Sequence, residues 1–139
     1  MSKGQAQIFT EFLSFAIGLL VTISIAFIFS TSLSPRLINE ALDYHMDNII
    51  KQVETAASQL RYYSEYFGNK TVTMKLDLPP KLNKNTYELY KFGDELCVSI
   101  SSTQSFKCAD NTYNVQGSFV SGTRMRLTLS NNKITMSAD

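Results

Sequence analysis

The sequence predicts an α+β protein in which a long N-terminal helix packs on a C-terminal antiparallel β-domain. Two observations carry this prediction. An uncharged run of 24 residues, from Phe12 to Pro35, leads directly into an amphipathic helical pattern. After Gly68 the apolar residues instead alternate with a period of two, which is typical of half-buried strands. We therefore expect a hydrophobic helix over residues 5–35, an amphipathic helix over 36–68 and an antiparallel β-domain over 69–139.

The uncharged run is long enough to cross a membrane. At about 1.5 Å per residue it spans roughly 36 Å, more than the hydrocarbon core of about 30 Å. Its apolar residues occur all round the helix, whereas a soluble domain would show a stripe. A cleaved secretory signal, the alternative, would have a shorter apolar region followed by small residues at a cleavage site. Lys3 and the α-amine are the only cations before the run, which favours a cytoplasmic N-terminus.

One row of the hydrophobic helix consists of small residues. They are spaced by four: Ser14, Gly18, Thr22, Ala26 and Ser30. Such a row forms a shallow groove that lets a second helix approach closely in lipid. The alternative is composition alone, because small residues are common in membrane helices. We expect helix–helix packing along this row.

The amphipathic segment has one continuous apolar stripe, as a helix needs when it packs one face on a sheet. The stripe consists of Leu42, Met46, Ile49, Val53, Ala56, Leu60, Tyr63 and Phe67, widened by Ala41, Ile50 and Ala57. Pro35 should bend the helix and not end it, because the periodicity resumes at once. Gly68-Asn69 should end the helix, since both residues accept the left-handed conformation.

Short strands separated by turn residues follow. We expect them at residues 72–78, 86–92, 95–101, 105–108, 114–119, 124–129 and 133–136. Such a set of strands predicts an antiparallel meander or a small sandwich, with the helix stripe covering one face.

Cys97 and Cys108 flank a predicted hairpin that turns at Ser102-Thr103, so they should lie opposite one another. A cross-strand disulfide would suit an extracellular domain. The alternative is two reduced, half-buried thiols, because the register could slip by one residue. No histidine lies near either cysteine, so the pair does not resemble a zinc site.

No pattern in the chain predicts an enzyme. There is no Gly-rich phosphate loop, no HExxH motif and no plausible Ser-His-Asp set. His45 is the only histidine, and Asp43 and Asp47 lie among solvated residues. The net charge of +1 is well mixed, which argues against a nucleic-acid partner. We therefore expect no catalytic residue, no metal and no cofactor.

The sequence Lys3-Gly4-Gln5, followed by an apolar helix, an amphipathic helix and a β-domain, resembles an archaeal type IV pilin with a class III signal peptide. The resemblance implies that residues 1–4 are a leader, cut between Gly4 and Gln5 by a prepilin peptidase. It implies a membrane precursor that an assembly ATPase and a membrane platform build into an extracellular helical filament of identical subunits. Adhesion or surface attachment is the role expected for such a filament.

Two positions depart from the family pattern. Many euryarchaeal pilins carry Ser and Glu at the third and fifth mature positions, where this chain has Gln7 and Phe9. The nearest carboxylate is Glu11, which would pair with the α-amine of Gln5 on a neighbouring subunit or stabilise the N-terminal end of its own helix. Family members are often glycosylated, and Asn69-Lys70-Thr71 is the only sequon.

The sequence supports a second function class as well. A single-pass anchored protein, whose outer domain binds another component as an accessory or stator of a surface appendage, would have the same apolar helix. The leader separates the two hypotheses, because a pilin is cut after Gly4 and an anchored binder keeps Met1.

Overall fold

The computed structural model describes the backbone of residues 3–68 and 70–139, with the side chains from Gln7 onward. It divides into two compact units, Met1–Glu40 and Ala41–Asp139. The first unit is helical throughout its described part. The second contains most of α2 together with the whole sheet.

In the first unit the helix α1 (Lys3–Ile28) passes into a π-helical segment, η1 (Phe29–Leu33), and then into α2 (Ser34–Tyr66). The Ser34 amide donates to the carbonyl of Phe29, five residues earlier. Pro35 has no amide hydrogen, and its ring would crowd the carbonyl four residues before it. The wider turns of η1 therefore precede Pro35, and the helix continues through it as predicted.

In the second unit one face of α2 is buried. The buried residues are Leu42, Met46, Ile49, Ile50, Val53, Ala56, Ala57, Leu60 and Ser64. The predicted stripe was wrong at its two ends. Ala41, Tyr63 and Phe67 are exposed, and Ser64 is buried in place of Tyr63. Ser64 borders the turn at Asn131 and Asn132, where a small side chain fits. Gly68 ends the helical region at φ +76°.

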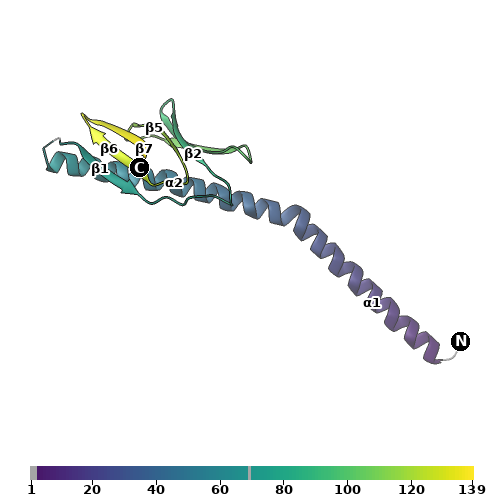
Figure 1. Ribbon diagram of the computed structural model, residues 1–139. Coiled ribbons are helices and arrows are strands. Elements are labelled where there is room, and N and C mark those ends of the chain that lie inside the picture. The colour runs from purple at the N-terminus through teal and green to yellow at the C-terminus, as the bar shows by residue number, and fades with distance from the viewer. Residues whose placement is uncertain (1–2, 69) are drawn as a thin grey trace. The chain divides into compact units, whose positions relative to one another are not determined.

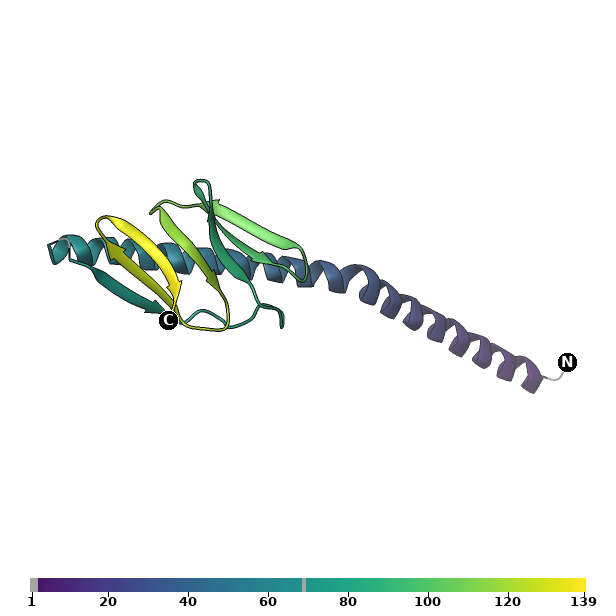
Figure 2. The same cartoon turned by 45° about the horizontal axis from the view of Figure 1, so that its top comes forward.

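All seven predicted strands are present, with ends within two residues of those expected. They are β1 (Val72–Leu76), β2 (Glu88–Phe92), β3 (Glu95–Ile100), β4 (Ser105–Asp110), β5 (Val115–Val120), β6 (Met125–Ser130) and β7 (Lys133–Ala138). They form one sheet in the order β1-β6-β7-β5-β2-β3-β4. In Figures 1 and 2 the strands lie on one side of α2.

The predicted meander or sandwich was wrong in its topology. The sheet is mostly antiparallel, but β5 and β7 are parallel, with Val115 opposite Ile134. After β5 the chain skips one position in the sheet to form β6, and β7 then fills the position between β6 and β5. Asn131 and Asn132 both have positive φ, of 49° and 63°, as a tight turn from β6 to β7 requires. The fold is thus α+β, with one helix covering one face of a single sheet.

The core lies between α2 and the sheet. Alternate residues of each central strand face the helix, among them Leu89, Val98, Phe119, Leu127 and Ile134, each at most 2% exposed. Since the core uses only this face, the other residues of each strand form an uncovered outer face. That outer face is available for contacts with other molecules.

Candidate functional site

The first candidate surface is the apolar helix α1. The large apolar side chains between Ile8 and Phe29 are each 49–70% exposed. They surround the helix, so no single face is sheltered. The described residues contain one helix that is long enough and apolar enough to cross a membrane, either as an anchor or as a signal. Such a surface is unfavourable in water and needs lipid or other helices around it.

A shallow depression marks the small-residue row. It has a volume of about 580 Å³ and is lined by Phe15, Gly18, Leu19, Thr22 and Ile23. A Cβ atom added to Gly18 would have no neighbour within 4 Å, so the space above it is open. Ser30, the last residue of the predicted row, lies in η1 and not in α1. Gly18 and Thr22 are the residues of the predicted row that line this depression, and Ser14 and Ala26 lie about one turn to either side of them in α1.

Three hydroxyl groups between Thr22 and Thr31 donate to backbone carbonyls one turn earlier. Thr22 Oγ1 donates to the carbonyl of Gly18 at 2.9 Å, and Ser24 Oγ donates to that of Leu20 at 2.8 Å. Thr31 Oγ1 donates to the carbonyl of Phe27 at 2.8 Å. These bonds let the side chains lie in lipid without an unsatisfied donor.

The predicted processing residues lie at the start of α1. The backbone of Lys3, Gly4 and Gln5 is helical, while their side chains lie outside the described part of the chain. Glu11 is exposed and lies two turns into α1. Because the helix dipole acts mainly within the first turn, Glu11 contributes little to its own helix end. The predicted contact of Glu11 with a neighbouring subunit stays a prediction. Asn69 lies outside the described residues.

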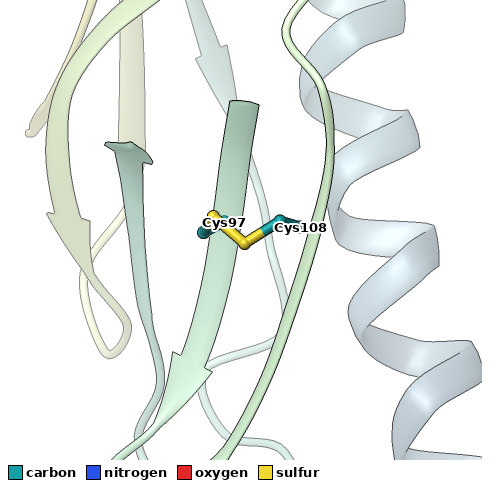
Figure 3. Close-up of a disulfide and its surroundings, with 2 residues drawn as sticks. All are labelled: Cys97 and Cys108. Carbon is teal, nitrogen blue, oxygen red and sulfur yellow. A yellow bond between two sulfur atoms is a disulfide. The ribbon is translucent and has the colours of Figure 1, made fainter. Parts of the chain in front are cut away.

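Cys97 and Cys108 are joined by a disulfide, with the sulfurs 1.99 Å apart (Figure 3). They lie directly opposite one another on β3 and β4. Their Cα atoms are 4.1 Å apart, close to the spacing of an antiparallel pair that exchanges no hydrogen bonds. Glu95 has a carboxylate oxygen within 4.8 Å of both sulfurs. Because the sulfurs are bonded to each other, no thiolate is free to bind a metal there.

The disulfide forms the centre of a patch on the outer face of the sheet, which we call the aromatic–acidic patch. The registers of β2, β3 and β4 arrange it in three rows: Phe92, Glu95 and Asp110; Tyr90, Cys97 and Cys108; and Glu88, Ser99 and Phe106. Phe92 and Phe106 are each 70% exposed. A depression of about 330 Å³ lies between the aromatic rings and above the disulfide. This patch combines exposed aromatic area with carboxylates.

A second aromatic group lies at the C-terminal end of α2, and we call it the distal cluster. It consists of Tyr62, Tyr63, Tyr66 and Phe67, which are 45–76% exposed. Their rings contact one another, with Tyr66 and Phe67 meeting edge to face at 5.3 Å between centroids. Arg61 and Lys70 are exposed beside it. Tyr62 and Tyr66, which are 67% and 76% exposed, do not belong to the core.

Tyr87 has a structural role. It is 2% exposed, and its hydroxyl donates to the carbonyl of Pro79 at 2.7 Å. Burial raises the pKa of Tyr87 to about 12. Its amide also donates to Ser121 Oγ at 2.9 Å. These contacts tie the segment before β2 to the turn after β5.

No protein-family model, curated protein or solved structure matches this chain. Function must then be inferred from the surfaces themselves. They are an apolar helix with a groove and a folded unit with two exposed aromatic groups.

Proposed function

We propose that this chain is the structural subunit of an archaeal type IV pilus-like extracellular filament, used for adhesion or surface attachment. The subunit polymerises through α1 after a prepilin peptidase removes residues 1–4. The assembly ATPase and membrane platform are its expected partners, and the membrane is the location of its precursor. The observation that carries the proposal is an apolar helix with no sheltered face joined to a separately folded unit.

The proposal follows from the environments in which α1 is stable. A helix that exposes apolar side chains on every side is stable in a bilayer or in a bundle of similar helices. The open groove at Gly18 allows close backbone approach in such a bundle. The disulfide of the second unit is compatible with an oxidising environment outside the cytoplasm. Together these features favour a filament with α1 at its centre and the sheet outside.

The second candidate is a single-pass accessory or stator-like protein of a surface appendage. The aromatic–acidic patch favours it, since an exposed apolar patch marks a protein contact of some kind. In that case α1 stays in the membrane and the patch binds another envelope component.

The N-terminal sequence and intact mass of the protein from its native cells separate these functions. A mature chain that begins at Gln5 supports the filament subunit. An uncut chain from Met1 to Asp139 contradicts processing and favours the anchored protein. Electron microscopy of sheared surface filaments, with peptide mapping of their subunit, tests polymerisation independently of the leader.

A further inference from the structure

The aromatic–acidic patch and the distal cluster differ in charge. Four acidic residues lie in or beside the patch: Glu88, Asp94, Glu95 and Asp110. Glu95 and Asp110 are directly opposite one another, an arrangement of like charges that destabilises a sheet. Within the described part of the chain, no ion pair neutralises any of the four. The patch therefore carries negative charge that a cationic partner would neutralise.

The distal cluster has the opposite character. The exposed basic residues Arg61 and Lys70 flank its aromatic residues in the sequence, with one carboxylate, Glu65, between them, and the exposed Lys133 follows the β6–β7 turn. Lys70 and the turn before Lys133 border one depression at this end of the unit, next to Ser64. Across the described residues, none of these three cations forms an ion pair. Guanidinium and ammonium groups also bind favourably over aromatic faces such as those of Phe92 and Phe106.

The two surfaces lie at different places along α2. The loop after β4 reaches the helix at Glu54, whose carboxylate accepts from the Thr112 amide at 3.0 Å. At about 1.5 Å per residue, Glu54 and Tyr66 are roughly 18 Å apart along the helix axis. In Figures 1 and 2 the C-terminal end of α2 extends beyond β1, and β2 lies beside earlier turns. One copy cannot satisfy its own patch, but a second copy can.

We propose that the aromatic–acidic patch is a docking surface for a second copy of this chain, which inserts the basic, aromatic distal cluster of its α2. The inference rests on the proposed function and assigns the contact between outer units. Because the two surfaces differ, the interface is heterologous, and a pair of copies keeps one free patch on one copy and one free distal cluster on the other. Repetition of such a contact builds an open chain and not a closed dimer. The disulfide below the patch holds β3 and β4 together, so little ordering is needed on binding.

Charge exchange on the full chain in its native cells tests the docking. The double variant Glu95→Lys/Asp110→Lys should lower the filament yield about tenfold, because like charges would then face each other. Arg61→Glu/Lys70→Glu should do the same, and combining all four changes should restore the yield to within about threefold of wild type. The matched control Glu40→Lys/Asp43→Lys makes the same change in net charge on exposed helix positions and should retain the wild-type yield.

A zero-length carboxyl-to-amine cross-linker gives an independent readout. In filaments mixed from light and heavy isotope-labelled copies, it should join Asp110 or Glu95 of one copy to Lys70 of another. Wild-type filaments without this link, or a fourfold variant that stays as defective as its parents, would overturn the docking and leave the filament intact. Cells whose wild-type chain stays uncut and forms no filament would instead overturn the proposed function, and the docking with it.

Discussion

Gly117 is the position in the sheet where an added methyl group should do most damage. It lies in β5 opposite Met136 of β7, at the parallel pairing. Its φ is +101°, which L side chains rarely adopt, and an added Cβ would lie 2.7 Å from the carbonyl oxygen of Met136. Replacing Gly117 with Ala therefore adds both backbone strain and a collision with the neighbouring strand.

A matched glycine separates the two effects. Gly122 has φ +115°, and an added Cβ there would meet nothing within 4 Å. Gly122→Ala should therefore show only the strain of a positive φ, about 1–3 kcal/mol. Gly117→Ala should show that strain and also push β7 away, weakening one or two hydrogen bonds of about 1 kcal/mol each. The difference between the variants should be about 2 kcal/mol in the free energy of unfolding.

Thermal unfolding of the full chain in detergent micelles, followed by near-ultraviolet circular dichroism of its tyrosines, measures this difference. For a unit of about 100 residues, 2 kcal/mol corresponds to a Tm roughly 8–16 °C lower for Gly117→Ala than for Gly122→Ala. Equal melting temperatures for the two variants would refute the close approach of β5 and β7. A cooperative transition in both variants is the control that the sheet still folds.

Three further predictions concern the groove, the disulfide and Tyr87. Gly18→Leu should reduce filament yield while leaving membrane insertion intact, whereas Ser24→Leu, off the small-residue row, should assemble normally; equal yields would reject the groove. Cys97→Ser/Cys108→Ser should lower the free energy of unfolding by about 3 kcal/mol and Tm by roughly 12–24 °C, because the disulfide joins residues 11 positions apart. Wild-type protein in reductant should melt at the same temperature as this double variant. A Tm unchanged from that of the oxidised wild type would contradict the disulfide. The pKa of Tyr87 in the folded protein is raised to about 12, above its ordinary value near 10, so its contribution to stability should be complete below pH 10 and lost as the pH rises from 10 to 12. Tyr87→Phe should remove this loss of stability. Identical alkaline unfolding profiles for the variant and the wild type would exclude Tyr87 as the source of the loss.

Local patterns carried most of the fold. The change of apolar period after Gly68 predicted every strand, because alternation reflects which face of a strand is buried. The same reasoning predicted the helix and its core face as far as Leu60. It missed the burial of Ser64, because that depends on the β6–β7 turn, which comes from a distant part of the chain.

Strand order is a property of long-range pairing, and local periodicity carries no information about it. The alternation of residues in β7 is compatible with a place at the edge beside β6, whereas the structure places β7 between β6 and β5. Pro35 showed in the sequence where the helix would be irregular. That the Ser34 amide bonds to the carbonyl of Phe29, five residues earlier, was seen only in the structure. Short-range pattern therefore predicted the elements, and tertiary contacts decided their arrangement.

The candidate site was predictable to a similar extent. The hairpin geometry predicted that Cys97 and Cys108 face each other, because only the short turn between them matters. The aromatic–acidic patch was missed, although Tyr90 and Phe92 alternate with Leu89 and so had to share a face. Their neighbours across the sheet become known only with the register that joins β2 to β3. The distal cluster was visible in the sequence as four aromatic residues within six positions. The sequence did not show that these side chains are exposed.

Assembly of such a subunit should depend on the outer unit as much as on α1. When α1 leaves lipid for a helix bundle, it exchanges one apolar environment for another, so burial of its side chains gives little net free energy. The aromatic side chains of the outer unit leave water instead, at about 25 cal/mol for each Å² of apolar surface buried. In the proposed filament, the groove at Gly18 would set how closely the helices pack, and contacts such as the proposed one between the distal cluster and the patch would supply most of the favourable free energy. Mutations in the outer unit should therefore shift the balance between membrane pool and filament more strongly than conservative apolar exchanges in α1.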